Sequence, residues 1–203
     1  MAKIFLVRHG ETKLQSSERL WGHTDVELSD AGVWQAERAR DRLAAEKIDV
    51  IYSSHLKRAA KTAEIIASRH NLKVIPCPEI GEVNFGEVEG FTFKEVGARY
   101  PELAKPWPNN SLTARFPGGE SFDDLNRRVS KFLERLDKHT PEETALVVAH
   151  NGPLRLIICD LLRLEPLRWR QFRLDLGAIS TMETYPGGAA LTSLNDTAHL
   201  IKS

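Results

Sequence analysis

Short apolar runs alternate along the chain with longer segments whose apolar residues recur every three or four positions. The runs Lys3 to Arg8, Asp49 to Tyr52 and Ala145 to Ala149 predict buried strands, and a shorter strand is expected around Lys73 to Pro76. Alternation of strands with helices favours a mainly parallel sheet covered by helices. We therefore expect an α/β fold, a three-layer sandwich with a mainly parallel central sheet flanked by helices.

The helical segments begin after polar residues that can cap them. Ser29 or Asp30 can cap a first helix, and Ser53 and Ser54 can cap a second. The longest amphipathic pattern spans residues 122–136 and predicts a further helix before the strand that ends at Ala149.

A proline-rich segment interrupts this alternation. The stretch from Gly90 to Gly119 contains four prolines and cannot be one continuous helix, so it predicts a small inserted lid over about residues 90–120. The tail from Ile179 to Leu194 has strand-like segments around a Pro-Gly-Gly turn. A length of 203 residues without repeats or linkers suits a single domain, 1–203.

The charge balance limits the partners that the chain can attract. Lys and Arg number 28 and Asp and Glu number 28, so the surface as a whole has no net field for nucleic acid or an anionic membrane. No apolar run is long enough for a membrane span. The only cysteines, Cys77 and Cys159, match no ligand or redox spacing, and reduced core thiols fit a cytoplasmic protein.

Two histidines follow directly on predicted strands. His9 comes after the first strand, and His150 comes after the strand that ends at Ala149. Because the carboxyl ends of parallel strands meet at one edge of a sheet, the two imidazoles can lie together. Gly10 is expected to let the backbone approach a ligand closely. For each histidine alone, a structural role is the commoner outcome.

Charged residues near these histidines suit an anionic ligand. The guanidinium groups of Arg8 and Arg58 can each form several charge-assisted hydrogen bonds with a phosphate. Glu82 lies in a turn-rich segment that can bring a carboxylate to the same cleft, although acidic residues in such segments are usually only solvated. The remaining histidines have no spacing typical of a metal site.

A series of motifs gives these residues a common context. In order, they are Arg8-His9-Gly10-Glu11-Thr12, Gly22 to Gly32 followed by Gln35-Ala36, Ser53 to Ala63, Glu82 to Gly90, Pro117 to Ser121, and Val148 to Gly152. In content and order they resemble the histidine phosphatase family, also called phosphoglycerate mutase-like. The resemblance extends from about Lys3 to Gly152.

The resemblance implies a mechanism without a metal or cofactor. His9 would accept the phosphoryl group, Arg8, Arg58 and a protonated His150 would hold it, and Glu82 would protonate the leaving group and then activate water. The expected substrate-binding residues are Gln15, Gly22, His23, Asn151 and Gly152. Gln15 stands where many members have asparagine, and its longer side chain keeps the amide donors but reaches further.

The predicted activity is that of a phosphoric monoester hydrolase of the histidine acid phosphatase type, acting on small phosphate esters. The short chain and the segment 22–25 most resemble α-ribazole phosphatases of cobalamin assembly and related broad-specificity phosphatases, so α-ribazole 5′-phosphate is one candidate. A small molecule, rather than nucleic acid or membrane, is the expected partner. The sequence leaves a homodimer open.

Two other functions stay open. A phosphoglycerate mutase-type phosphotransferase would use the same phosphohistidine, but such mutases are typically longer and carry a basic insertion. A non-catalytic phosphoester-binding module would not need the full set of His9, Glu82 and their partners. The predicted lid residues Trp107, Arg115 and Phe116 either shape a substrate pocket or pack the lid onto the body.

Overall fold

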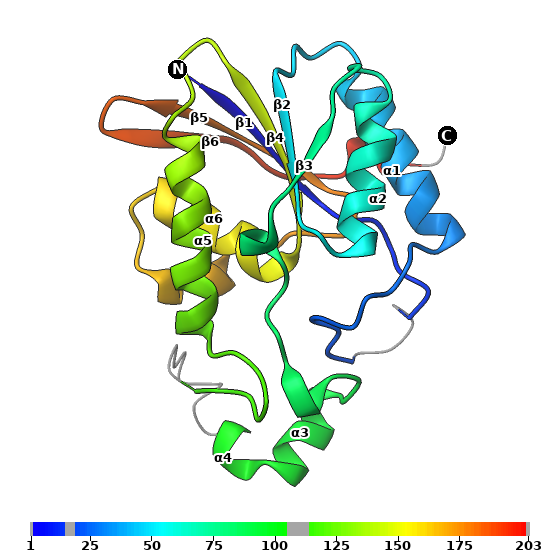
Figure 1. Ribbon diagram of the computed structural model, residues 1–203, viewed down its shortest axis with the longest axis vertical. Coiled ribbons are helices and arrows are strands. Elements are labelled where there is room, and N and C mark those ends of the chain that lie inside the picture. Colours follow the sequence, from blue (N-terminus) through cyan, green and yellow to red (C-terminus); the bar gives the residue numbers. More distant parts are fainter. Residues whose placement is uncertain (1, 15–18, 105–113, 202–203) are drawn as a thin grey trace.

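A six-stranded sheet forms the centre of the computed structural model, which describes residues 2–14, 19–104 and 114–201 (Figure 1). The strand order is β3-β2-β4-β1-β5-β6. The first four strands run parallel, whereas β5 is antiparallel to β1 and β6 is antiparallel to β5. This confirms the predicted mainly parallel sheet and the hairpin in the tail. The strands are β1 (Lys3–Arg8), β2 (Val50–Ser53), β3 (Val74–Pro76), β4 (Thr144–Ala149), β5 (Ile179–Tyr185) and β6 (Gly188–Asp196).

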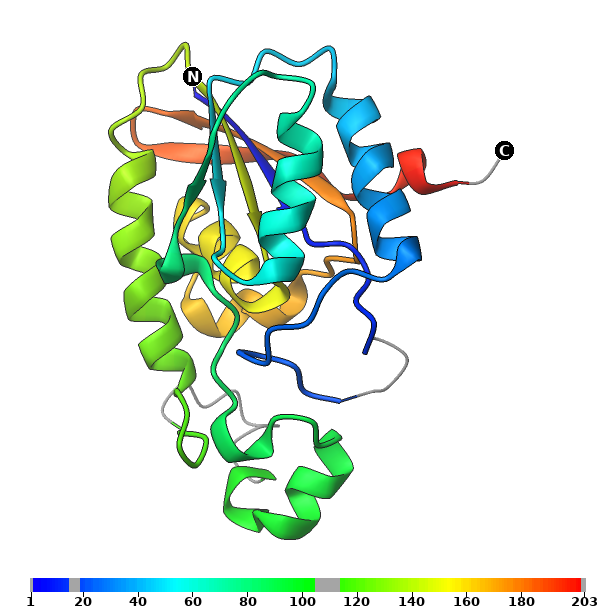
Figure 2. The same cartoon turned by 45° about the vertical axis from the view of Figure 1, so that its right-hand side comes forward.

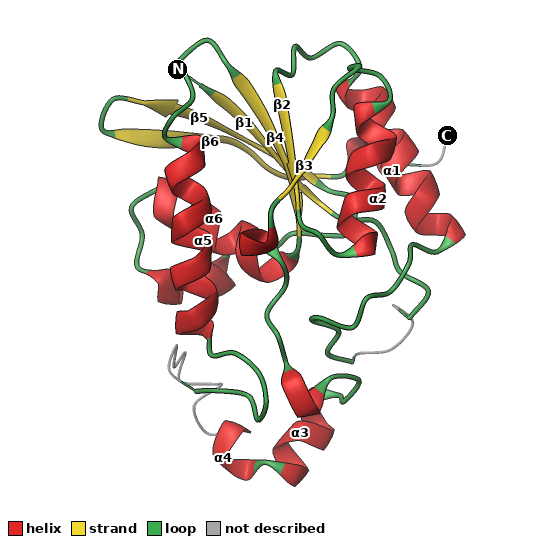
Figure 3. Ribbon diagram, viewed as in Figure 1, coloured by secondary structure: helices red, strands yellow, loops and turns green. Residues whose placement is uncertain are grey.

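Helices cover both faces of the sheet, as Figures 2 and 3 show. Alternate side chains of β1 point to opposite faces: Phe5 and Val7 pack with α1 and α2, and Ile4 and Leu6 pack with α5 and α6. The α-helices are α1 (Asp30–Leu43), α2 (Lys57–Ala67), α3 (Phe93–Arg99), α4 (Pro101–Ala104), α5 (Phe122–Leu136) and α6 (Asn151–Leu161). Short 3₁₀ helices are η1 (Pro78–Ile80), η2 (Gly86–Val88), η3 (Pro166–Gln171) and η4 (Ala198–Leu200). The predicted three-layer arrangement is therefore confirmed.

One of the two predicted helix caps is correct. The Ser29 hydroxyl accepts a hydrogen bond from Gly32 N and caps α1. The prediction for Ser53 and Ser54 is wrong, because Ser53 ends β2 and α2 begins only at Lys57 without a side-chain cap. Ser54 has another partner: its Oγ lies 2.8 Å from Nε2 of a buried histidine, described below.

The inserted segment is not one helix, as its prolines predict. It contains α3 and α4, which lie together away from the sheet in Figure 1. Phe116 is buried and packs edge-on against Phe85, and Arg115 pairs with Asp124 at 2.6 Å, so both residues attach this segment to the body. Trp107 lies outside the described residues.

Within the described part of the chain, no helix is long and apolar enough to cross a membrane. Both cysteines are buried and carry free thiols, as expected from their spacing.

Candidate active site

His9 and His150 lie together at the carboxyl ends of two adjacent parallel strands. β1 pairs with β4 so that Arg8 is opposite Ala149, and the N–H of His9 donates to the carbonyl oxygen of Ala149 over 3.0 Å. The two imidazole centroids are 4.9 Å apart, and both rings are buried. The strand pairing therefore brings together the histidines that the sequence singles out.

The position of one proton on His9 follows from a single contact. Nδ1 of His9 lies 2.7 Å from the carbonyl oxygen of Gly10, which can only accept a hydrogen bond. Nδ1 must therefore carry the hydrogen, which leaves the lone pair on Nε2. Burial, and then the charges of Arg58 and Arg8, hold the pKa of His9 well below its usual value. The ring is neutral near pH 7 and Nε2 can act as a nucleophile.

Arg58 fixes the opposite tautomer on His150. Its Nε–H donates to Nδ1 of His150 over 3.2 Å, so the ring hydrogen lies on Nε2 and is donated to Ser54 Oγ. Burial, followed by the charge of Arg58, keeps the pKa of His150 well below its usual value. The protonated His150 that the sequence analysis favours is therefore wrong for this structure, because a guanidinium occupies the nitrogen that would take the proton.

Arg8 is a second buried guanidinium at this edge of the sheet. Nη1 donates to the carbonyl oxygen of Leu174 over 2.7 Å, while Nε is buried without an acceptor among the described residues. Desolvation lowers the pKa of Arg8 to about 10, so the side chain is still a cation at neutral pH. Arg8 thus has donors that suit an anionic ligand.

Glu82 reaches the same edge from the segment between η1 and η2. Its Oε1 accepts hydrogen bonds from Val83 N at 3.0 Å and from Gly152 N, at the start of α6, at 3.2 Å. A Cβ atom at residue 152 would lie 2.5 Å from Oε1 of Glu82. The glycine therefore makes room for the carboxylate, a relationship that the sequence did not reveal.

Arg128 of α5 holds the backbone of this segment. Its guanidinium donates to the carbonyl oxygens of Glu79 (2.8 Å), Gly81 (2.7 Å) and Glu82 (2.7 Å). It also binds both carboxylate oxygens of Glu120, at 2.9 and 3.0 Å. All five N–H groups of the arginine are thereby used. The sequence analysis did not select Arg128, because its helical pattern shows only a polar position.

Glu89 organises the loop that supports Arg58. Its carboxylate accepts hydrogen bonds from the main-chain N–H groups of residues 22–24, from the Thr24 hydroxyl and from Phe85 N. The carbonyl oxygens of the same loop, at Gly22 and Thr24, accept from Arg58 at 2.6 and 3.0 Å. Glu89 thus acts on the site through Arg58, although no motif reasoning pointed to it.

Gly10 has a different role from the one expected. A Cβ atom there would lie 2.4 Å from the carbonyl oxygen of Gly32, so the glycine permits close packing against the start of α1. Its N–H donates to Thr62 Oγ1 over 3.2 Å, and the Thr62 hydroxyl donates to the carbonyl oxygen of Arg58 over 2.8 Å. The expected close approach is therefore to the protein itself.

A cavity of about 670 Å³ opens at this edge of the sheet. Arg8, Glu82, Asn151 and Gly152 contribute to its wall, and Trp21 and Phe93 add aromatic surface. His9, Arg58 and His150 are buried and do not form part of this wall, although His9 and His150 follow and precede the wall residues Arg8 and Asn151 in the chain. Gly22 and His23 do not belong to this wall, and their main-chain N–H groups donate to Glu89. Gln15 lies outside the described residues.

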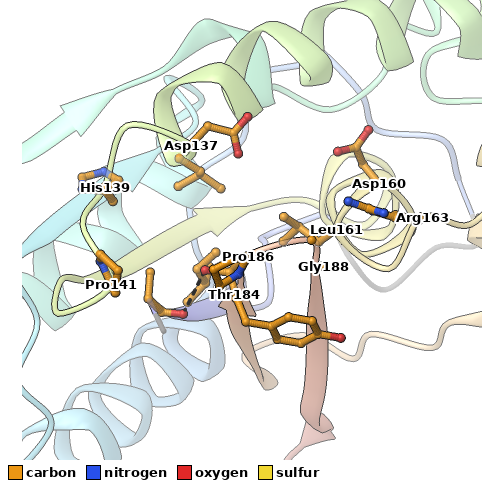
Figure 4. A pocket seen from close by; sticks show the side chains of 14 residues that line it. Asp137, His139, Pro141, Asp160, Leu161, Arg163, Thr184, Pro186 and Gly188 are labelled. Atoms are coloured by element: carbon orange, nitrogen blue, oxygen red, sulfur yellow. Dashed lines mark hydrogen bonds between the residues drawn. The ribbon is translucent and has the colours of Figure 1, made fainter.

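A second cavity, of about 540 Å³, lies where β1 begins, at the opposite end of this strand from His9. Figure 4 shows its polar side chains, which include Asp137, His139, Asp160 and Arg163. It contains none of the predicted site residues. Among the described residues, no group of three or more His, Cys, Asp or Glu side chains is placed to hold a metal ion.

Known proteins resemble this chain in sequence and in structure. Phosphoserine phosphatase 1 of Hydrogenobacter thermophilus is 36% identical over 200 residues, covering 98% of this chain and 95% of the relative. Phosphoglycerate mutase-like protein 4 of Arabidopsis thaliana is 42% identical over 158 residues, covering 76% of this chain and 68% of the relative. The crystal structure of the α-ribazole phosphatase from Shigella flexneri superposes with a TM-score of 0.88 at 30% identity, covering 96% of each chain.

These names differ in substrate but agree in pointing to phosphate esters, and two of the three are phosphatases. The family resemblance predicted from the motifs is confirmed. The model of the histidine phosphatase superfamily, branch 1, matches residues 4–197, and the chain belongs to this family.

Proposed function

We propose that this protein hydrolyses phosphate monoesters of small metabolites through a phosphohistidine on Nε2 of His9. The contact between His9 Nδ1 and the Gly10 carbonyl oxygen carries this proposal, because it leaves the Nε2 lone pair available. The low pKa of the buried ring keeps that lone pair unprotonated. Phosphatase-named relatives over nearly the whole chain support the same activity.

The reaction has two balanced steps. In the first, Nε2 of His9 attacks phosphorus, the bond from phosphorus to the ester oxygen breaks, and Glu82 gives its proton to the leaving oxygen. In the second, the Glu82 carboxylate takes a proton from water as the water oxygen attacks phosphorus. The P–N bond then breaks, which releases inorganic phosphate and restores His9.

The transferring group carries negative charge that the site can stabilise. Arg8 and Arg58 supply guanidinium N–H donors near His9, in surroundings that exclude water and strengthen electrostatic interactions. Neutral His150 acts as a polar neighbour, and Arg58 and Ser54 hold its orientation. We propose that this charge arrangement performs the chemistry without a metal ion.

The size of the cavity suits a small ester. Trp21 and Phe93 offer flat apolar surface on its wall, so α-ribazole 5′-phosphate is a reasonable member of a test panel. The same phosphohistidine could instead return the phosphoryl group to substrate, as in a mutase. The fate of the phosphoryl group distinguishes the two activities.

The decisive experiment follows labelled phosphate with a chelator present throughout. Phosphate release would be measured from α-ribazole 5′-phosphate, fructose 2,6-bisphosphate, phosphoglycerates and 4-nitrophenyl phosphate. We expect acid-labile, base-stable label on the wild-type protein, longer-lived label on Glu82→Gln, and none on His9→Ala. His70→Ala, after the end of α2, is the matched control and should behave as wild type. Full turnover by His9→Ala would overturn the proposal, and label moving between phosphoglycerate positions without phosphate release would establish a mutase.

A further inference from the structure

Arg155 lies on the same helix face as Asn151, one turn further along α6. Residues four apart on a helix are neighbours, and both side chains contribute to the wall of the 670 Å³ cavity together with Arg8 and Glu82. Nothing in the proposed phosphoryl transfer uses Arg155.

The guanidinium of Arg155 has no conventional polar partner within the described part of the chain. It lies 5.4 Å from the ring centroid of Trp169, and its Nε is shielded from solvent without an acceptor. It forms no hydrogen bond or ion pair with any described residue. A guanidinium that is partly desolvated and lacks an acceptor raises the free energy of the folded state. An anionic group supplied by a ligand would remove this cost.

The cavity wall carries an excess of positive charge, which also favours an anionic ligand. Four arginines contribute to it, against the single carboxylate of Glu82. Arg19 is already paired with Glu95 at 2.9 Å. A transferring phosphate would occupy Arg8 and the neighbouring Arg58. Arg170 lies 5.5 Å from the ring centroid of Trp169 and has a further interaction within the protein. Arg155 is then left over, and desolvation lowers its pKa more than the nearby charge of Glu82 raises it.

We propose that Arg155 binds a second anionic group of the substrate, so that the preferred esters carry a carboxylate or another phosphate beside the phosphate that is cleaved. This inference rests on the proposed function and narrows its substrate class. Asn151 adds a further element, because its Oδ1 is buried without a donor among the described residues. It can accept a hydrogen bond from a hydroxyl or ammonium group between the two anions. Phosphorylated hydroxy acids and amino acids fit this pattern, whereas α-ribazole 5′-phosphate has no second anion.

The test compares three esters that differ at one end only: glycerol 3-phosphate, 3-phosphoglycerate and glycerol 1,3-bisphosphate. We expect kcat/KM of the wild-type protein to be about 10- to 100-fold higher for an ester with a second anion, the range typical of a hydrogen bond to a charged group. A larger value for 3-phosphoglycerate identifies a carboxylate site, and a larger value for the bisphosphate identifies a second phosphate site. Arg155→Met should reduce this preference to near one, and Arg155→Lys should restore part of it.

Arg168→Met is the matched control, since Arg168 is exposed on η3 beside Trp169 and is not part of the cavity wall. It should keep the preference of the wild-type protein. The inference is overturned if the wild-type protein treats the three esters alike, a comparison that needs no variant, or if Arg155→Met slows all three by one factor. Absence of phosphate release from every ester, including 4-nitrophenyl phosphate, would instead contradict the proposed function itself.

Discussion

Arg128 donates from Nη2 to the main-chain carbonyl oxygen of Glu82 over 2.7 Å, and its other N–H groups bind the neighbouring carbonyls and Glu120. The carboxylate proposed as the proton donor therefore takes its position from a side chain of α5. Arg128 contacts only the backbone of Glu82, so it acts as a positioning residue.

Replacing Arg128 should impair proton transfer more than phosphoryl binding. Arg128→Ala is expected to lower kcat for alkyl phosphates by at least about 10-fold, a part of the roughly 10²- to 10⁴-fold that general acid catalysis contributes. The rate for 4-nitrophenyl phosphate should fall much less, because that leaving group needs no proton. Steady-state kinetics on both esters checks this. Arg127→Ala, on the exposed side of α5, should leave both rates unchanged, and equal losses for both esters in Arg128→Ala would indicate general damage.

Adding a methyl group at residue 152 should displace the carboxylate of Glu82 directly, whereas Arg128 acts on its backbone. In Gly152→Ala the new Cβ would lie 2.5 Å from Glu82 Oε1, so the carboxylate must move. We expect the same selective loss on alkyl esters as in Glu82→Gln, with 4-nitrophenyl phosphate largely spared. The control is Gly188→Ala, where the atoms nearest to the added Cβ belong to the flexible side chain of Tyr185, from 3.2 Å. Wild-type kinetics in Gly152→Ala would contradict the geometry.

Glu89→Gln should disturb the loop of residues 22–24 and, through it, Arg58. An amide presents a donor to a set of N–H groups, so several hydrogen bonds are lost and the free energy of unfolding should fall by about 2–4 kcal/mol. KM for every ester should rise, because Arg58 loses its support. Urea unfolding and kinetics measure the two effects. Glu87→Gln, on the exposed side of η2, should change neither, and an unchanged KM in Glu89→Gln would refute the link to Arg58.

The two buried histidines should lower the free energy of unfolding as the pH falls. Their pKa values in the folded protein lie well below 6.5, whereas in the unfolded chain they return to roughly 6.5. As the pH falls below that value, the unfolded state takes up protons that the folded state does not, so stability decreases. Each histidine can remove up to about 1.4 kcal/mol per pH unit. Urea unfolding between pH 7.5 and 5.0 should show a shallower slope for His150→Gln than for the wild type. Identical slopes would mean that folding leaves the pKa of His150 unchanged, which would contradict its neutral state in the folded protein.

The order of strands and helices was predictable because each buried strand is a short apolar run bounded by polar residues. The meeting of His9 with His150 followed from strand ends alone. The start of α2 was not predictable from Ser54. Its hydroxyl accepts from Leu56 N just before the helix and also lies against the distant imidazole of His150, a partner that only the tertiary structure reveals.

The residues that support the site, Glu89 and Arg128, were not predictable from the sequence because their partners are distant in the chain. Glu89 binds a loop 65 to 67 positions earlier in the chain, and Arg128 binds carbonyls 46 to 49 positions earlier. Partners at such separations leave no local pattern. Arg155 looks like an ordinary polar position of α6, and only the tertiary structure shows that it shares a cavity wall with Arg8 and Glu82. What the sequence could not give was the set of neighbours around each charged group.

Placing the first strand in the middle of the sheet has a consequence for synthesis on the ribosome. β1 lies between β4 and β5, and the backbone of Arg8 and His9 bonds to Gly177 and Ala178, far along the chain. The residue proposed as nucleophile is translated well before Gly177, whose N–H donates to its carbonyl oxygen. A nascent chain that ends before Ala178 lacks the hydrogen bonds that hold Arg8 and His9 against residues 177 and 178. Activity should therefore emerge only after the hairpin of β5 and β6 has been made and can add to the sheet.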